Sequence, residues 1–146
     1  MAITSAICNS FKQEILEAEH NFTASTGNTF NLALYTSSAT LGAGTTAYTT
    51  TEEITNTSGT AYTAKGKALT SVTPTLDSST AVCDFADVSW TSASFTANGC
   101  LIFNDCHSTD AAVCAIAFGG DKTVSSGTFT IQFPAAAATT AIIRIA

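Results

Sequence analysis

Apolar and polar residues alternate at two different spacings along the chain, and the spacing changes near residue 30. In the first segment four apolar residues recur at every fourth position: Ile3, Ile7, Phe11 and Ile15. This spacing places them on one face of a helix, with Leu16 beside them. Thr4 or Ser5 is suited to cap the start of such a helix. The pattern therefore predicts an N-terminal α-helix within residues 1–22.

From residue 30 onward the period is two, as in half-buried strands. Strands are predicted at 30–35, 68–76, 81–85, 88–90, 99–105, 111–118, 128–133 and 141–146. Residues 107–110 are expected to join two of them, residues 119–122 carry a second hairpin-turn signal, and Pro74 indicates an edge strand or a bulge. Several short strands separated by turns favour a mainly β fold, an antiparallel sandwich or a small barrel. At 146 residues, the chain fits a single domain spanning 1–146.

The segment 37–66 departs from both patterns. It is rich in Thr, Gly, Ala and Ser and has little apolar periodicity. Loops of this length are uncommon in compact domains and are often functional. We expect a long Thr-rich arm that contacts a partner, with a flexible surface loop as the alternative. The candidate contact residues are Tyr48, Ile54, Tyr62, Lys65 and Lys67, and replacing both tyrosines by alanine is expected to leave the domain folded.

Charge narrows the possible partners. The net charge is −6 and only five residues are Lys or Arg, so the sequence argues against nucleic acid and anionic membranes as partners. No apolar run reaches the roughly 20 residues of a membrane span, and residues 1–10 lack a signal-peptide pattern. Charged residues make up 11% of the chain, against about 25% in an average domain. Such a surface suits a protein that neighbours cover, although compositional drift is an alternative.

Candidate chemistry is sparse. Cys100, Cys106, His107 and Cys114 are the only cluster of metal-ligand types, and their gaps are wider than those of structural zinc sites. We expect reduced core cysteines, no metal and no cofactor. No nucleophile or phosphate-binding motif occurs, so a non-enzymatic protein is expected, with no catalytic residues. A small glycoside hydrolase with paired carboxylates and a glycan-binding module with an aromatic platform stay open as alternatives.

Several segments resemble one known group of proteins. They are ITSAICNSFKQE at 3–14, TFNLALYT at 29–36, GTAYT at 59–63, GKAL at 66–69, FGGDK at 118–122, FTIQFP at 129–134 and AIIRIA at 141–146. Together they resemble small virion structural proteins of tailed bacteriophages, over nearly the whole chain.

The resemblance implies a structural role and carries no catalytic residues. It implies a virion protein assembled in the host cytoplasm, most simply a capsid decoration or cement protein that stabilises the head shell. Its partners would be copies of itself, as in a trimer, and other virion proteins such as the major capsid protein. The alternative is a neck or tail component: an adaptor, a tube protein or a tail-associated protein.

Overall fold

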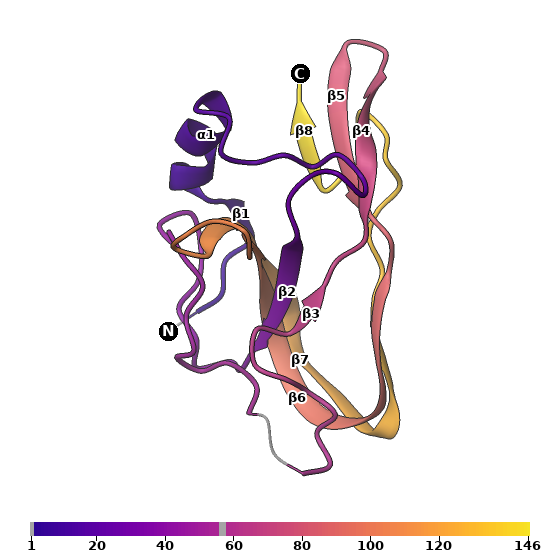
Figure 1. Cartoon of the computed structure of the whole chain (residues 1–146). Helices are drawn as coiled ribbons and strands as arrows, with labels where there is room; N and C mark the ends of the chain where they lie inside the picture. The colour runs from indigo at the N-terminus through magenta and orange to yellow at the C-terminus, as the bar shows by residue number, and fades with distance from the viewer. Residues whose placement is uncertain (1, 56–57) are drawn as a thin grey trace.

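A computed structural model gives the fold, and it describes residues 2–55 and 58–146. The elements in chain order are β1 (Ala6–Ile7), α1 (Asn9–Leu16), β2 (Phe30–Tyr35), β3 (Lys67–Ala68), β4 (Ser71–Asp77), β5 (Thr80–Phe85), β6 (Val88–Asn104), β7 (Ala111–Ile131) and β8 (Ile143–Ile145). The described strands form two open antiparallel sheets, ordered β1-β7-β6-β2-β3 and β4-β5-β8 (Figure 1). The mainly β prediction is confirmed, as a sandwich and not as a closed barrel.

The long hairpin of β6 and β7 is the backbone of the fold. The inner half, next to the turn at residues 105–110, pairs Cys100 with Ile116. The outer half, at the open end of the hairpin, pairs Trp90 with Phe129. Register shifts interrupt the ladder between these halves, and shifts of this kind bend a strand pair. Figure 1 shows the ribbon turning back at the lower end of the molecule. The outer half of the hairpin therefore folds back toward the inner half, within the five-stranded sheet.

The predicted hairpin turn at residues 119–122 is wrong, because these residues lie within β7. Ala97 pairs with Lys122 and Gly99 pairs with Ala117, so four residues of β7 stand opposite Asn98 alone. Gly119 and Gly120 have φ values of +74° and +138°, which glycine adopts without a steric penalty. The glycines therefore allow a bulge, and the chain reverses at residues 105–110, as expected.

The N-terminal prediction needs a correction. Residues 2–8 are not helical: Ile3 forms a bridge with Leu41, and β1 pairs with Cys114 and Ala115 of β7. The helix begins at Asn9, after Cys8 at its N-cap, so neither Thr4 nor Ser5 caps it. Within α1, Phe11 is 3% exposed and faces the core, whereas Leu16 is 88% exposed. The edge of β7 offers hydrogen bonds to the first residues, and this pairing replaces the first helical turns.

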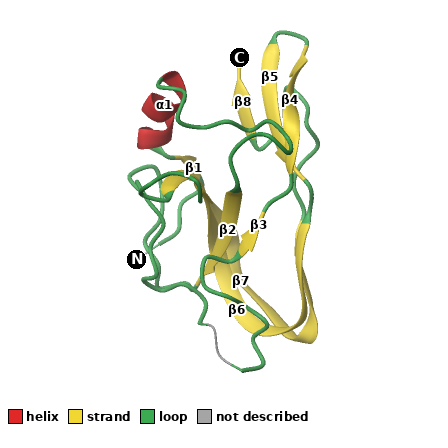
Figure 2. Ribbon diagram, viewed as in Figure 1, coloured by secondary structure: helices red, strands yellow, loops and turns green. Residues whose placement is uncertain are grey.

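The three-stranded sheet stands at the upper end of the molecule, the same end as α1 (Figure 2). β4 is one of its two edge strands, and the register with β5 shifts between Val72 and Thr75, around Pro74. The prediction of an edge strand or bulge at Pro74 is thus confirmed. The last predicted strand, 141–146, is shorter, because only Ile143–Ile145 pair with β5.

Candidate functional site

The Thr-rich segment 37–66, whose residues 56–57 lie outside the described part, runs along its own domain. Its backbone bonds to β2 and to the residue that follows it: Ile54 N–H donates to Leu34 O, and Thr36 N–H donates to Glu52 O, each at 2.9 Å. It also reaches the start of β7, where Ala112 N–H donates to Thr46 O at 3.0 Å. Because the segment covers β2, residues on both faces of that strand are buried.

A buried carboxylate organises this segment. Glu53 Oε1 accepts the hydroxyl of Tyr62 at 2.7 Å and the backbone N–H of Lys65 at 2.8 Å, and Glu53 Oε2 accepts the hydroxyl of Tyr48 at 2.5 Å. The Tyr62 oxygen in turn accepts the N–H of Leu34 at 2.9 Å. Burial, and then the hydrogen bond to Glu53, raise the pKa of Tyr48 to about 12 and that of Tyr62 further. Both hydroxyls therefore remain donors at neutral pH. Their hydrogen bonds to Glu53 hold the Thr-rich segment together and fix it to β2.

The two candidate lysines have partners within the subunit. Lys65 Nζ lies 2.9 Å from Asp105 Oδ1 and 2.9 Å from Asp110 Oδ2. Hydrogen bonds to Asp110 and then Asp105 raise the pKa of Lys65. Lys67 donates to the carbonyl of Ser89 and lies 5.6 Å from the centre of the Trp90 ring.

The five candidate contact residues fall into two groups by exposure, two that are buried and three that are at least partly exposed. Tyr62 is 1% exposed and Ile54 is also buried, both in the core of this domain. A neighbouring subunit cannot reach them, so the expectation that they fill pockets on a partner is wrong for these two. Contact with a partner stays a prediction for Tyr48, Lys65 and Lys67. Sequence reasoning missed Glu53, because it lies in a polar stretch with no period.

A second polar cluster ties α1 to β6. The buried ring of His20 has Nε2 at 2.8 Å from Glu14 Oε2 and Nδ1 at 3.1 Å from the Asn104 amide nitrogen. The amide donates to Nδ1, so Nε2 carries the proton that Glu14 accepts. Asn104 also donates to the carbonyl of Glu19 at 3.2 Å. Both ring nitrogens are thus engaged in holding structure.

The cysteines, which we expect to be reduced and free of metal, lie at several places in the fold. Four of the five cysteines are buried, Cys106 is exposed, and all are free in the described part of the chain. The Sγ atom of Cys106 accepts the N–H of Thr29 at 3.2 Å. Among residues 2–55 and 58–146, no three His, Cys, Asp or Glu side chains are placed to hold one metal ion.

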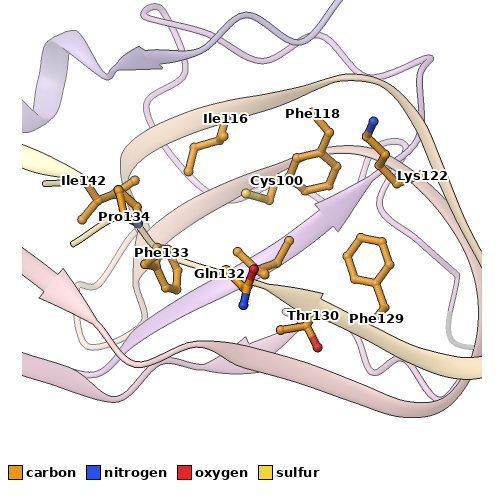
Figure 3. Close-up of a pocket in the computed structure, with 11 residues that line it drawn as sticks. Cys100, Ile116, Phe118, Lys122, Phe129, Thr130, Gln132, Phe133, Pro134 and Ile142 are labelled. Atoms are coloured by element: carbon orange, nitrogen blue, oxygen red, sulfur yellow. The ribbon is translucent and has the colours of Figure 1, made fainter. Parts of the chain in front are cut away.

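An open groove lies between the inner half of the β6–β7 hairpin and the end of β7 (Figure 3). Its cavity measures about 490 Å³. Six half-buried apolar side chains line it: Ile116, Phe118, Phe129, Ile131, Phe133 and Ile142. Lys122 is the charged residue on its rim, and Figure 3 shows it at the opposite end from Pro134 and Ile142.

An apolar row is exposed at the upper end of the molecule. Leu76 pairs with Ala81, and Ala81 pairs with Ile145, so these three side chains share one face of the small sheet. Leu76 is 71% exposed and Ile145 is 55% exposed. This apolar row (Leu76, Ala81 and Ile145) continues the core-facing side of the sheet, where Cys83 and Ile143 are buried. The row lies past the end of the buried core, so Leu76 and Ile145 stay exposed to solvent.

Helix α1 borders the same end. Ile15 lines a narrow hollow together with Ile143 and Ile145, and the next residue, Leu16, is the most exposed large apolar side chain of the described residues. Sequence reasoning assigned Leu76 to a strand face and Leu16 to the helix stripe. It could not tell that neither has a partner, because that depends on which elements pack together.

Comparison of the chain with protein-family models, with curated proteins and with solved structures finds no match. In the part of the chain that the structure describes, no helix has the length and apolar character to cross a membrane. The apolar row is therefore the candidate functional surface, on its geometry alone.

Proposed function

We propose that this chain is a non-enzymatic structural protein of a bacteriophage particle, a decoration or cement protein that binds copies of itself and the major capsid protein on the head shell. The observation that carries the proposal is the apolar row, together with Leu16 of the neighbouring helix α1. Leu16, Leu76 and Ile145 are each more than half exposed, and Figure 1 shows α1, β4 and β8 at the same end of the fold. Exposed clusters of large apolar residues mark interaction surfaces.

The energetics of such a contact suit a shell protein. Covering one exposed Leu or Ile fully contributes about 1.5–3 kcal/mol, so one subunit gains only modest affinity from this end. Subunits linked to each other bind a shell through several contacts at once, and avidity multiplies the weak ones. The low fraction of charged residues reduces the cost of covering the surrounding surface.

The test is the incorporation of variants into particles. Leu76→Asp places a charge in the row, and Thr75→Asp places the same charge on the neighbouring exposed residue, which faces the other side of β4. Circular dichroism first verifies that both variants fold, and quantitative mass spectrometry then gives their copy number on purified particles. We expect Leu76→Asp to lose most of its occupancy and Thr75→Asp to load as the unmodified chain does.

The copy number also separates the two virion roles. A decoration protein is present in numbers that match the capsid lattice, and its loss lowers the temperature at which the shell releases its contents. A neck or tail component is present in a few to a few dozen copies, and its loss leaves shell stability unchanged. Absence of the protein from purified particles, or full loading of a folded Leu76→Asp variant, contradicts the proposal.

A further inference from the structure

The groove has the composition of a ligand site for an apolar chain. Its volume of about 490 Å³ lies within the range of about 300–1,000 Å³ typical of small-molecule sites. The aromatic rings of Phe118 and Phe129 lie at one end, with centroids 6.2 Å apart, and Phe133 lies toward the other. The groove shares no lining residue with the apolar row, so its occupant is a separate question from assembly.

The shape of the groove selects a linear ligand. Figure 3 shows the lining residues spread from Lys122 at one end to Pro134 and Ile142 at the other, with Cys100 between them. Cys100 is fully buried and closes the floor with an apolar surface. A chain of methylene groups laid along this groove would exchange water for these side chains over its whole length.

The charge of the groove indicates which head group a bound amphipathic ligand would carry. The protein has eleven Asp and Glu residues against five Lys and Arg, yet the residues that line the groove include Lys122 and no carboxylate. Within the described residues, the Lys122 ammonium has neither an ion pair nor a hydrogen bond to the protein. Lys65, by contrast, is paired with Asp105 and Asp110. An anion at this end of the groove would be attracted by the Lys122 ammonium, although the protein as a whole is negatively charged.

From this arrangement we infer that the groove binds one straight-chain amphipathic anion, an alkyl carboxylate, with its head group at Lys122 and its tail directed toward Ile142. Lys122 supplies charge selectivity, and the apolar side chains supply most of the affinity. Lys122 is itself exposed, so a head group bound there stays in contact with water.

Isothermal titration calorimetry with octanoate, decanoate and dodecanoate, each below its micelle concentration, tests the proposal on the full chain. We expect one site per chain. Each pair of added methylenes tightens binding by about 15-fold until the groove is filled. Decanol tests the apolar part alone, and decyltrimethylammonium presents the opposite charge.

Two variants with the same change in net charge test the head-group position. Lys122→Glu is expected to weaken decanoate binding by about tenfold or more and to favour decyltrimethylammonium instead. Lys12→Glu, on the exposed face of α1, is expected to change either affinity by less than about twofold. Both lysines are exposed, so both variants should fold, which the unfolding temperature verifies.

The proposal is overturned if no saturable binding occurs, if decanol binds as tightly as decanoate, or if both variants weaken binding equally. Sedimentation of the same samples examines the other possible occupant. If Lys122→Glu changes the oligomeric state while no carboxylate binds, the groove is a contact between subunits and not a ligand site. None of these results depends on whether the chain is a virion protein.

Discussion

The side chains that hold the Thr-rich segment in place form one connected group around Glu53. Its carboxylate receives hydrogen bonds from two tyrosine hydroxyls and one backbone N–H, and the Tyr62 oxygen also accepts a bond from Leu34 of β2. A buried carboxylate is tolerated only when such partners replace water. The sequence shows Tyr48 and Tyr62 in two similar four-residue stretches, but nothing in it shows that both hydroxyls meet at one carboxylate.

Removing one hydroxyl separates the two tyrosines. Tyr62→Phe leaves the buried N–H of Leu34 without its partner and removes one of the two hydrogen bonds that Glu53 Oε1 accepts, so we expect it to lower the free energy of unfolding by about 1–3 kcal/mol. Tyr48→Phe removes a single bond at a half-buried site and should lower it by less. Urea denaturation of both variants measures the difference. Equal losses would show that the bond to Leu34 contributes nothing.

The cysteines differ in accessibility, since four are buried and Cys106 is exposed. Burial raises the pKa of the Cys8 thiol to about 11 and that of Cys83 to about 12, and it raises those of Cys100 and Cys114 as well. Because the thiolate is the reactive form, these four should stay unmodified by iodoacetamide at pH 8 in the native state. The exposed Cys106 should react. Peptide mass spectrometry checks this, and labelling of Cys114 at the rate of Cys106 would contradict the burial described.

At the scale of single elements, the sequence predicted strands better than it predicted their limits. The alternation around residues 30–35 and 128–133 identified β2 and the end of β7. The predicted strands at 88–90 and 99–105 proved to be parts of one strand, β6, since a strand continues through bulges that interrupt the apolar period. The four-residue spacing near the N-terminus indicated a helix, but pairing with β7 prevailed over it up to Cys8.

Helix α1 allows a matched test of packing. Phe11 is buried against Phe22 and His20, with ring centroids 6.0 Å and 4.9 Å away. Phe11→Ala should therefore lower the free energy of unfolding by about 3–5 kcal/mol. Leu16→Ala, in the same helix, should change it by less than about 0.5 kcal/mol, because the side chain is already in water. Thermal or urea unfolding measures both, and a loss below about 1 kcal/mol for Phe11→Ala would mean that α1 is not part of the core.

At the scale of the whole molecule, the Thr-rich segment changes role. Its lack of apolar periodicity suggested an arm that reaches outward, whereas the structure lays it over β2, with Ile54 and Tyr62 in the core. Tyr62→Ala would open a cavity there, so the double tyrosine-to-alanine variant is now expected to destabilise the domain. Sequence patterns miss such coverage because an irregular segment buries scattered side chains and satisfies its backbone through bonds to distant residues.

The upper end, with the apolar row and Leu16, leaves large apolar side chains uncovered, and it should drive self-association of the isolated protein. Two features oppose each other there: apolar surface favours contact, while a net charge of −6 on each copy makes copies repel. Salt screens that repulsion, with a Debye length of about 30 Å at 0.01 M and about 10 Å at 0.1 M. Sedimentation equilibrium should therefore show association that strengthens with protein concentration and with salt.

Leu76→Asp should weaken this self-association at least about tenfold, and Thr75→Asp, which adds the same charge, should weaken it far less. Association that salt weakens, or that both variants reduce equally, would mean that ion pairs or another surface hold the copies together.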